Sequence, residues 1–355
     1  MMKMNKWTMA LAAAGVVSLS SVAQAQEAAA GADALAASTT LSGYVSTSYT
    51  LADGSSSEIG KQNGDARDQF KLDIVSLTLS SAQGAGEYAT GYTVGLWVGP
   101  DDQGTSTNGA NTAAGDGDLV ELTQANIDLR LPVGNGLDLK IGKFGTVVGY
   151  ETYEYNANAF FQRGLGFNAE PTHHTGVLAS YQVNDDLAVA VAAVNDSSNN
   201  TTNNNGGDNN AALAATVSYT LGDGTGALGG TELYGATIRD LNAVDYWYLQ
   251  VGLPVPVEGL SLDFAADWVD AEAGNDGEIY QVYAAYTLSD KATLNARYEW
   301  GDDDAAGLVN MDSVAVGITY DLWDNVISRV EWMSTDEDGA TDSDDTLAFN
   351  IVYSF

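Results

Sequence analysis

The last ten residues of the chain, Thr346–Phe355, read TLAFNIVYSF. Large apolar side chains recur at every second position: Leu347, Phe349, Ile351, Tyr353 and Phe355. Because successive side chains of a β-strand point to opposite faces, this alternation predicts a strand with one apolar face. The fold then depends on whether that face meets a protein core or lipid.

The same alternation runs back through the chain to Leu41, in segments of about ten residues separated by breaks rich in Gly, Asn, Asp and Ser. We count about sixteen such segments, and fourteen or eighteen remain compatible with the pattern. The weakest lie near Thr175 and Thr231. The segments begin near Leu41, Phe70, Tyr88, Leu119, Leu137, Thr175, Leu187, Ala211, Thr231, Asp245, Leu260, Glu278, Ala292, Met311, Val326 and Thr346.

The connections between these segments alternate between short turns and long polar loops. Pro132 to Gly136 and Ser289 to Lys291 are short, whereas Gly99 to Asp118 and Gly145 to His174 are long. Short periplasmic turns and long external loops distinguish an outer-membrane barrel from a soluble sandwich. The sequence therefore predicts an all-β, antiparallel, up-and-down transmembrane barrel over residues 41–355. Lipid would cover its outside and water would fill its lumen.

The first 25 residues have the pattern of a secretory signal. Lys3 and Lys6 precede an apolar stretch, Trp7 to Leu19, and Ala23-Gln24-Ala25 supplies a small-x-small cleavage pattern. We expect residues 1–25 to be removed and residues 26–40 to form a periplasmic lead-in. The mature protein would then lie in the bacterial outer membrane.

The composition excludes several classes of protein. Without Lys3 and Lys6, 11 of the 13 basic residues remain against 48 acidic ones, a net charge of −37. That balance offers no basic face to nucleic acid. The apolar fraction of 45% is too high for a disordered acidic chain, and the absence of cysteine excludes disulfides and thiolate metal sites.

The third external loop, Gly145 to His174, combines aromatic residues with charged ones. A solvated external loop does not need so many rings, so we expect this loop to fold inward and narrow the pore. Its rings would pack on the barrel wall and its carboxylates would edge the opening. The alternative is an external loop that packs on its neighbours or on a trimer partner. The predicted constriction residues are Tyr150, Glu151, Tyr153, Glu154 and Arg163.

Charged residues at inward strand positions are expected to line the pore, because Lys or Arg facing lipid at the midplane costs roughly 2–4 kcal/mol. Wall cations opposite loop carboxylates would create a transverse field across the pore. Alternatively, each cation is paired with a neighbouring acid as a strut, and both arrangements can coexist. The expected wall residues are Lys71, Asp128, Arg130, Lys140, Arg297, Glu299, Arg329 and Glu331. Lys143 breaks the alternation, which suggests a strand end or a bulge.

Two acidic runs, Asp302-Asp303-Asp304 and Asp336-Glu337-Asp338, are expected to lie in loops. They could bridge lipopolysaccharide through loosely bound Mg²⁺ or Ca²⁺, which prefer oxygen ligands. Simple solvation explains them equally well, and neither run has the spacing of a calcium-binding loop. No other metal site and no cofactor are expected.

The middle of the chain resembles the OmpL-like group of Gram-negative porins. The resemblance rests on Gly142-Lys143-Phe144-Gly145, Gly149-Tyr150-Glu151, Asn158, Arg163 and Thr175-Gly176-Val177. It implies a single barrel that encloses a diffusion channel and has no catalytic residues. It also implies that the barrel-assembly machinery recognises the last strand through Phe349, Ile351, Tyr353 and Phe355, and that the barrel forms a homotrimer.

Together these patterns predict a porin that passes small hydrophilic solutes and prefers cations, because of its acidity. A sugar-selective channel remains open, as does a structural or adhesive barrel that displays the Asn-rich stretch Asn199 to Asn210. An enzyme is disfavoured. The two histidines, His173 and His174, would be split between opposite strand faces, and neither a Gly-x-Ser-x-Gly nor a His-Glu-x-x-His motif occurs.

Overall fold

The computed structural model describes residues 38–53, 69–99, 120–195, 211–241, 243–271, 276–303, 308–338 and 343–355. The expected signal peptide lies outside the described residues, as do residues 26–37 of the expected lead-in and the Asn-rich stretch Asn199 to Asn210.

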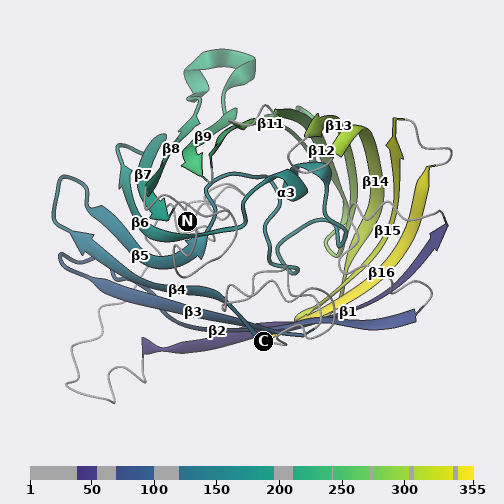
Figure 1. Cartoon of the computed structure of the whole chain (residues 1–355), viewed down its shortest axis with the longest axis horizontal. Coiled ribbons are helices and arrows are strands. Elements are labelled where there is room, and N and C mark those ends of the chain that lie inside the picture. Colours follow the sequence, from purple (N-terminus) through teal and green to yellow (C-terminus); the bar gives the residue numbers. More distant parts are fainter. Residues whose placement is uncertain are drawn as a thin grey trace.

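Sixteen antiparallel strands close into one barrel, in which each strand pairs with its neighbours in sequence (Figure 1). This confirms the predicted fold and the count of about sixteen. The strands are β1 Thr40–Asp53, β2 Gln69–Ser81, β3 Thr90–Val98, β4 Val120–Leu131, β5 Leu137–Gly145, β6 His173–Gln182, β7 Leu187–Asn195, β8 Ala211–Thr220, β9 Glu232–Leu241, β10 Val244–Leu253, β11 Leu260–Ala271, β12 Gly277–Ser289, β13 Ala292–Asp303, β14 Leu308–Trp323, β15 Val326–Glu337 and β16 Asp344–Ser354.

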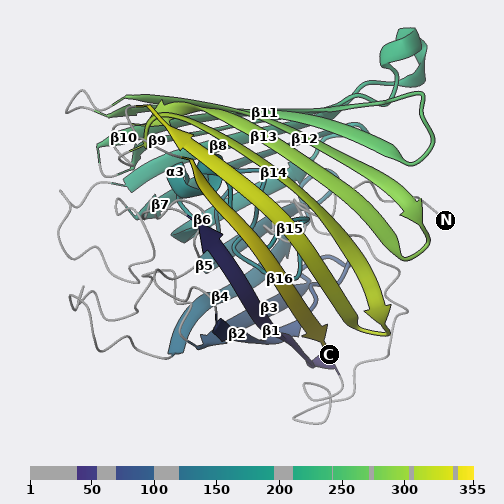
Figure 2. The same ribbon diagram turned by 90° about the vertical axis from the view of Figure 1, so that its right-hand side faces the viewer.

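The barrel closes where the last strand pairs with the first. Residues Tyr44 to Asp53 of β1 are in antiparallel register with residues Asp345 to Ser354 of β16, and Figure 2 shows the two strands side by side. Phe355 extends the ladder, because its N–H donates to the Gly43 carbonyl at 2.9 Å and its carbonyl accepts from the Gly43 N–H at 3.0 Å. Closure leaves no open edge, as a membrane-spanning sheet requires.

The two faces of the sheet have the predicted polarity. Along β16, Phe349 and Ile351 are 40% and 47% exposed on the outside, whereas the inward Asn350 is 1% exposed. Large apolar residues are exposed all around the barrel, and they include Tyr219, Tyr286, Trp300, Tyr320 and Trp332. A soluble sheet buries such residues, so this surface is suited to lipid.

The predicted alternation of short turns and long loops holds only in part, because β8 and β9 are connected by residues 221–231 at the end of the short turns, and β9 and β10 by residues 242–243 at the other end. Residues 132–136, 183–186 and 324–325 are short turns, whereas residues 146–172 between β5 and β6 form the longest connection. Among the described residues, no helix is long and apolar enough to cross a membrane. Two short helices are described: η1, Asp223–Leu228, between β8 and β9, and α3, Leu165–Ala169.

The placement of the acidic runs in loops was wrong. Asp302 and Asp303 are the last residues of β13, and Asp336 and Glu337 are the last of β15. The strands continue past the apolar segments, and both of their faces can be polar where lipid no longer touches them. Asp304 lies outside the described residues.

Candidate pore constriction

Residues 146–172, hereafter L3, connect β5 to β6 and carry the helix α3. In Figure 1, α3 lies inside the ring of strands, next to β12 and β13. Most of L3 is buried, including Tyr155, Phe160 and Phe161.

Two polar side chains organise L3 internally. The Asn158 Oδ1 accepts from the Thr152 N–H at 2.8 Å, and its Nδ2 donates to the carbonyls of Thr152 at 2.7 Å and Glu154 at 2.9 Å. The Arg163 Nη2 donates to the Tyr153 carbonyl at 2.9 Å. The Arg163 guanidinium also lies 5.0 Å from the ring centroids of both Tyr155 and Phe167, a favourable contact for a desolvated cation.

Two glutamates on the β13–β15 wall bind the L3 backbone. The Glu331 carboxylate accepts from the N–H groups of Phe161 at 2.6 Å and Gln162 at 2.7 Å. The Glu299 carboxylate accepts from the N–H groups of Leu165 at 3.1 Å and Gly166 at 3.3 Å. Both glutamates are fully enclosed, so these charge-assisted bonds are among the stronger contacts available to the loop.

Two arginines on the same wall complete this attachment. The Arg297 guanidinium is 2.5 Å from a Glu151 carboxylate oxygen and 2.9 Å from a Glu299 oxygen. The Arg329 guanidinium donates to the Asn158 carbonyl at 2.7 Å and to the Asn350 Oδ1 at 2.9 Å. Both arginines are buried. Both arginines therefore connect the wall to the loop. Arg297 is paired with its neighbouring acid Glu299 and also with the loop carboxylate Glu151, whereas the hydrogen bonds of Arg329 go to a loop carbonyl and a wall amide.

Two glycines let the L3 backbone reach the wall. A Cβ on Gly164 would lie 2.2 Å from a Glu299 carboxylate oxygen, and one on Gly166 would lie 2.1 Å from the Gln281 amide nitrogen. Real Cβ atoms do not approach so closely, so a side chain at either position would require the Glu299 carboxylate or the Gln281 amide to move. Sequence reasoning did not single out either glycine.

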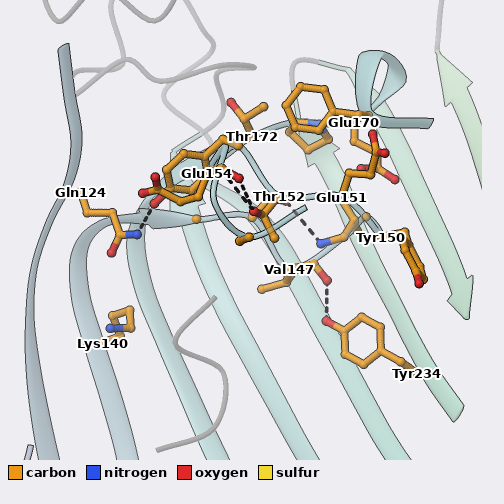
Figure 3. A pocket seen from close by; sticks show the side chains of 18 of the residues that line it. Gln124, Lys140, Val147, Tyr150, Glu151, Thr152, Glu154, Glu170, Thr172 and Tyr234 are labelled. Atoms are coloured by element: carbon orange, nitrogen blue, oxygen red, sulfur yellow. Dashed lines mark hydrogen bonds between the residues drawn. The ribbon is translucent and has the colours of Figure 1, made fainter. Parts of the chain in front are cut away.

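The β6–β10 wall contacts L3 through apolar side chains. Val147 and Val148 pack in one cluster with inward residues of this wall. Many of those wall residues are small: Ala190, Ala192, Val194, Ala212, Ala214 and Ala236. One polar contact joins them, because the Tyr234 hydroxyl donates to the Val147 carbonyl (Figure 3).

The remaining predicted L3 residues are also engaged with the walls. The Tyr150 ring stacks on Tyr283 with centroids 3.7 Å apart, and its hydroxyl donates to Asp263 at 3.2 Å. The Tyr44 hydroxyl donates to Glu154 at 2.7 Å. Burial raises the pKa of the Glu154 carboxyl, and the hydrogen bond from Tyr44 partly offsets that rise.

Glu151 was predicted to edge the opening with the other L3 carboxylates, and this stays a prediction. This carboxylate is buried, paired with Arg297, and accepts from the Gly164 N–H at 2.8 Å. An ionised carboxylate is stable there because a cation and a backbone donor compensate for the lost water.

A cavity of about 350 Å³ lies beside L3 and is lined by residues of β2–β5 and by one residue each of β9 and β10 (Figure 3). From L3 it is lined by Glu151, Glu154 and Glu170, among others. Sequence reasoning assigned no role to most of its wall residues, although their inward alternation marked them as lumenal. The strands contribute Thr78, Ser80, Thr93, Gln124, Lys140, Tyr234 and Gln250.

The cations predicted for β4 and β5 are paired along the wall. The Lys140 Nζ is 2.6 Å from Asp128, and an Arg130 Nη is 3.4 Å from Asp138. Lys71 is half-buried on β2. Lys143 is buried beside Gly142, whose φ is +130°, and its Nζ donates to the Leu122 carbonyl at 2.7 Å.

The described part of the chain holds no candidate metal centre, and its two histidines both contact L3. No group of three or more His, Cys, Asp or Glu there is placed to hold a metal ion. His173 and His174 both contact L3: the His173 ring lies 4.2 Å from that of Tyr153, and a His174 ring nitrogen lies 3.0 Å from the Thr146 hydroxyl.

Comparison with known proteins agrees with this architecture. The family model described as "Putative beta-barrel porin-2, OmpL-like" matches residues 38–355. A loop-deletion mutant of OmpT, an outer-membrane protein of Vibrio cholerae, has 15% identity over 89% of this chain and 99% of its own, with a TM-score of 0.60. An anion-selective porin of Comamonas acidovorans has 14% identity over 90% and 99%, with a TM-score of 0.59.

A third similar structure is OmpF of Salmonella typhi in complex with daunomycin, at 14% identity over 89% of this chain and 97% of that one, with a TM-score of 0.59. No curated protein matches the sequence. Identities this low establish the shared fold alone, so the chemistry of the pore has to be argued from this chain's own side chains.

Proposed function

This chain belongs to the OmpL-like family of outer-membrane β-barrel porins, and on that premise we propose that it forms a water-filled channel for passive diffusion of small hydrophilic solutes, with a preference for cations. The observation that carries the proposal is a closed sheet with apolar residues outside and buried polar and charged residues inside. Such a lumen suits water and hydrated solutes.

We propose that L3 narrows this channel. Its hydrogen bonds to Glu299, Glu331 and Arg329 support a position inside the lumen rather than above the barrel. The passage would run beside L3, along the β2–β5 wall, where the cavity lies. Wall side chains there are mostly neutral and polar, which suits general diffusion.

The cation preference is supported by the charges that line this cavity. Glu151, Glu154 and Glu170 of L3 line it, and of these Glu151 is paired with Arg297. The cation that the wall contributes, Lys140, is likewise paired with Asp128. The net charge of the whole chain is also negative. A relative of the same fold is described as anion-selective, so selectivity in this fold depends on individual side chains.

The packing of the L3 rings favours general diffusion over a sugar-selective channel. A sugar site needs accessible aromatic faces, but Tyr155, Phe160 and Phe161 are buried and Tyr150 is stacked on Tyr283. These rings support the loop instead. We therefore assign them a structural role.

We further propose that the barrel is a homotrimer, since OmpT of Vibrio cholerae is described in a trimer form. Its partners would be lipid, lipopolysaccharide and the barrel-assembly machinery, which would read the strand ending in Phe349, Ile351, Tyr353 and Phe355. The acidic ends of β13 and β15 would bind Ca²⁺ or Mg²⁺ at most loosely.

Single-channel recording in a planar bilayer with a KCl gradient tests these proposals. We expect stepwise openings of constant size, closure in three steps, and a reversal potential of the sign given by cation preference. A folded protein that never conducts would identify a structural barrel and overturn the channel. The opposite sign would overturn the cation preference alone.

A further inference from the structure

Aromatic residues are distributed unevenly over the outside of the barrel. At the long-loop end of β11–β13 they form a continuous group, in which the ring centroids of Trp268 and Tyr280 are 6.2 Å apart and those of Tyr280 and Trp300 are 5.5 Å apart. Tyr49 and Phe70 form a pair at the same end of β1 and β2, with centroids 4.9 Å apart. Rings at this height of an outer-membrane barrel meet the lipid headgroups.

The outer face of β3–β9, hereafter the aliphatic face, has a different composition. Among its described residues the outward side chains include neither Trp nor Phe, and its tyrosines, Tyr92, Tyr181 and Tyr219, all lie at the short-turn end. The long-loop end of this face therefore lacks the rings that lipid headgroups favour. Most of its other outward residues are aliphatic or small, and they include Ala125, Ile127, Val177, Val191, Leu213 and Ala215.

Small side chains let another protein surface approach this face closely. Val191, Ala215 and Thr237 form one row across β7, β8 and β9. Lipid is as apolar as such a row, so proteins associate in membranes mainly through van der Waals packing, which small residues make closer. The aliphatic face is therefore suited to contact with protein.

The size of the aliphatic face matches that of a stable protein interface. Neighbouring strands are about 4.8 Å apart, and the apolar band of an outer-membrane barrel is about 25 Å tall. The strands from β3 to β9 thus present roughly 800 Å² per copy. A standard interface takes about 800 Å² from each partner.

The connection between β8 and β9, residues 221–231, hereafter the arm, leaves the barrel on the same side. Figure 1 shows it outside the ring of strands, and Figure 2 shows it beyond the short-turn end. The strand pairing continues to Leu221, whose N–H donates to the Thr231 carbonyl at 2.9 Å. Beyond this point, residues 224–228 are exposed.

The tip of the arm projects into open space. A Cβ on Gly222, Gly224 or Gly226 would have no atom of another segment within 4 Å among the described residues. The tip is held by its own hydrogen bonds, since the Thr225 N–H and hydroxyl both donate to the Gly222 carbonyl, at 3.1 and 2.8 Å. Leu228 is 57% exposed there. A projection that holds its shape and presents an apolar side chain is suited to bind a protein surface.

We propose that the aliphatic face and the arm together form the contact between copies of this chain. The inference rests on the proposed homotrimer and names the surface that builds it. The aliphatic faces of three copies meet around the threefold axis, and each arm reaches the neighbouring copy at the short-turn end. The faces that carry the rings then point outward to lipid, where aromatic girdles belong.

The aliphatic face is tested through the mass of the detergent-solubilised protein, measured by light scattering over a range of concentrations. We expect three copies for the wild type. Ala215→Trp places a large ring in the middle of the face and should increase dissociation of the trimer about tenfold or more, because an overpacked contact cannot close. Ala284→Trp is the matched control. It adds the same ring to the outer face of β12, which is expected to face lipid, and should leave the mass unchanged.

The arm is tested in the same experiment with Leu228→Ser. Losing this apolar contact should increase dissociation of the trimer about fivefold. Val257→Ser is the control, because Val257 is 48% exposed on the turn between β10 and β11 and lies outside the arm. If Ala215→Trp does not fold, Leu228→Ser decides the question.

Single-channel conductance separates this inference from the proposed channel, because none of the four substitutions lies in the lumen and each copy should conduct as the wild type does. A wild-type protein that is monomeric at every concentration overturns the homotrimer and this inference, while a conducting monomer keeps the channel. A trimer that dissociates in Ala284→Trp but not in Ala215→Trp overturns the inference, because the face with the rings is then the contact. A trimer that neither Ala215→Trp nor Leu228→Ser weakens also overturns it.

Discussion

On the β6–β10 side of the lumen, L3 lies against small apolar residues such as Ala190 and Ala212, whereas on the β13–β15 side it is held by buried charges at Arg297, Glu299 and Glu331. The apolar wall binds L3 through complementary shape and dispersion contacts, which many different apolar side chains can supply. The charged wall binds L3 through directional hydrogen bonds and ion pairs. Each buried charge there needs its partners to compensate for the loss of water.

The two walls therefore differ in how strongly a substitution should disturb L3. Removing an apolar contact leaves a small gap that neighbours can partly fill. Removing one charged group leaves its partners buried and unpaired, which costs far more. The charged wall therefore fixes the position of L3, and the apolar wall supports it.

The largest effect is expected for Arg297→Met. The substitution leaves Glu151 and Glu299 buried without their cation, and breaking a buried pair in this way costs about 3–5 kcal/mol. We expect the urea midpoint of unfolding from lipid vesicles to fall accordingly, and L3 to leave the wall with an increase in single-channel conductance. Arg239→Met is the control, because Arg239 is about half exposed in its pair with Asp245 and should change stability by less than about 1 kcal/mol. Equal effects of the two substitutions would remove the distinction between the walls.

A smaller effect is expected for Gly164→Ala, which places a methyl group against the Glu299 carboxylate. The carboxylate is held by Arg297 and two backbone donors, so it cannot move away freely. We expect a loss of about 1–3 kcal/mol, as for other overpacked sites, together with a larger conductance. Gly224→Ala is the matched control, because no atom lies within 4 Å of a Cβ there. A Gly164→Ala channel with wild-type stability and conductance would count against close docking of L3 on Glu299.

On the apolar wall, Val148→Ala should cost about 1–2 kcal/mol, since it deletes two buried methyl groups from a cluster that can partly close. The conductance should stay near the wild-type value, because the charged wall still holds L3. Val316→Ala, on the lipid-exposed face of β14, provides the comparison in the same unfolding experiment. If Val148→Ala released L3 as fully as Arg297→Met, the apolar wall would be the true anchor.

The smallest effect on stability is expected for Lys140→Gln. Its pair with Asp128 is partly exposed in the lumen, so stability should change by about 1 kcal/mol or less. The substitution leaves Asp128 uncompensated beside the cavity, and the reversal potential should therefore shift further toward cations. A shift toward anions would exclude this side of the lumen from the ion path.

The fold was predictable from the sequence because its cause is local and repeated. Alternation along segments such as Thr346–Phe355 arises because one face of the sheet contacts lipid and the other contacts water. The sixteen strand segments were predicted from this alternation. The pattern stops at the rims, where both faces are polar. This is why Asp302, Asp303, Asp336 and Glu337 were mistaken for loop residues.

The attachment of L3 was less accessible to sequence reasoning. Composition indicated that the loop folds inward and that Arg297, Glu299 and Glu331 lie on the lumenal wall. It did not indicate which of these residues contacts which part of L3. Glu151 and Arg297 are 146 residues apart, and nothing near Glu151 signals that it is buried. Likewise, the need for glycine at position 164 arises from a carboxylate on a distant strand.

The size cut-off of the pore shows whether the charged wall holds L3 in the lumen. It is measured as the single-channel conductance in the presence of neutral polymers of graded size. If L3 is held in the lumen by the charged wall, Arg297→Met and Glu331→Gln should admit larger polymers than the wild-type channel does, whereas Val148→Ala should keep the wild-type cut-off. The same cut-off in all four proteins would contradict the account, because L3 would then not define the narrowest part of the channel.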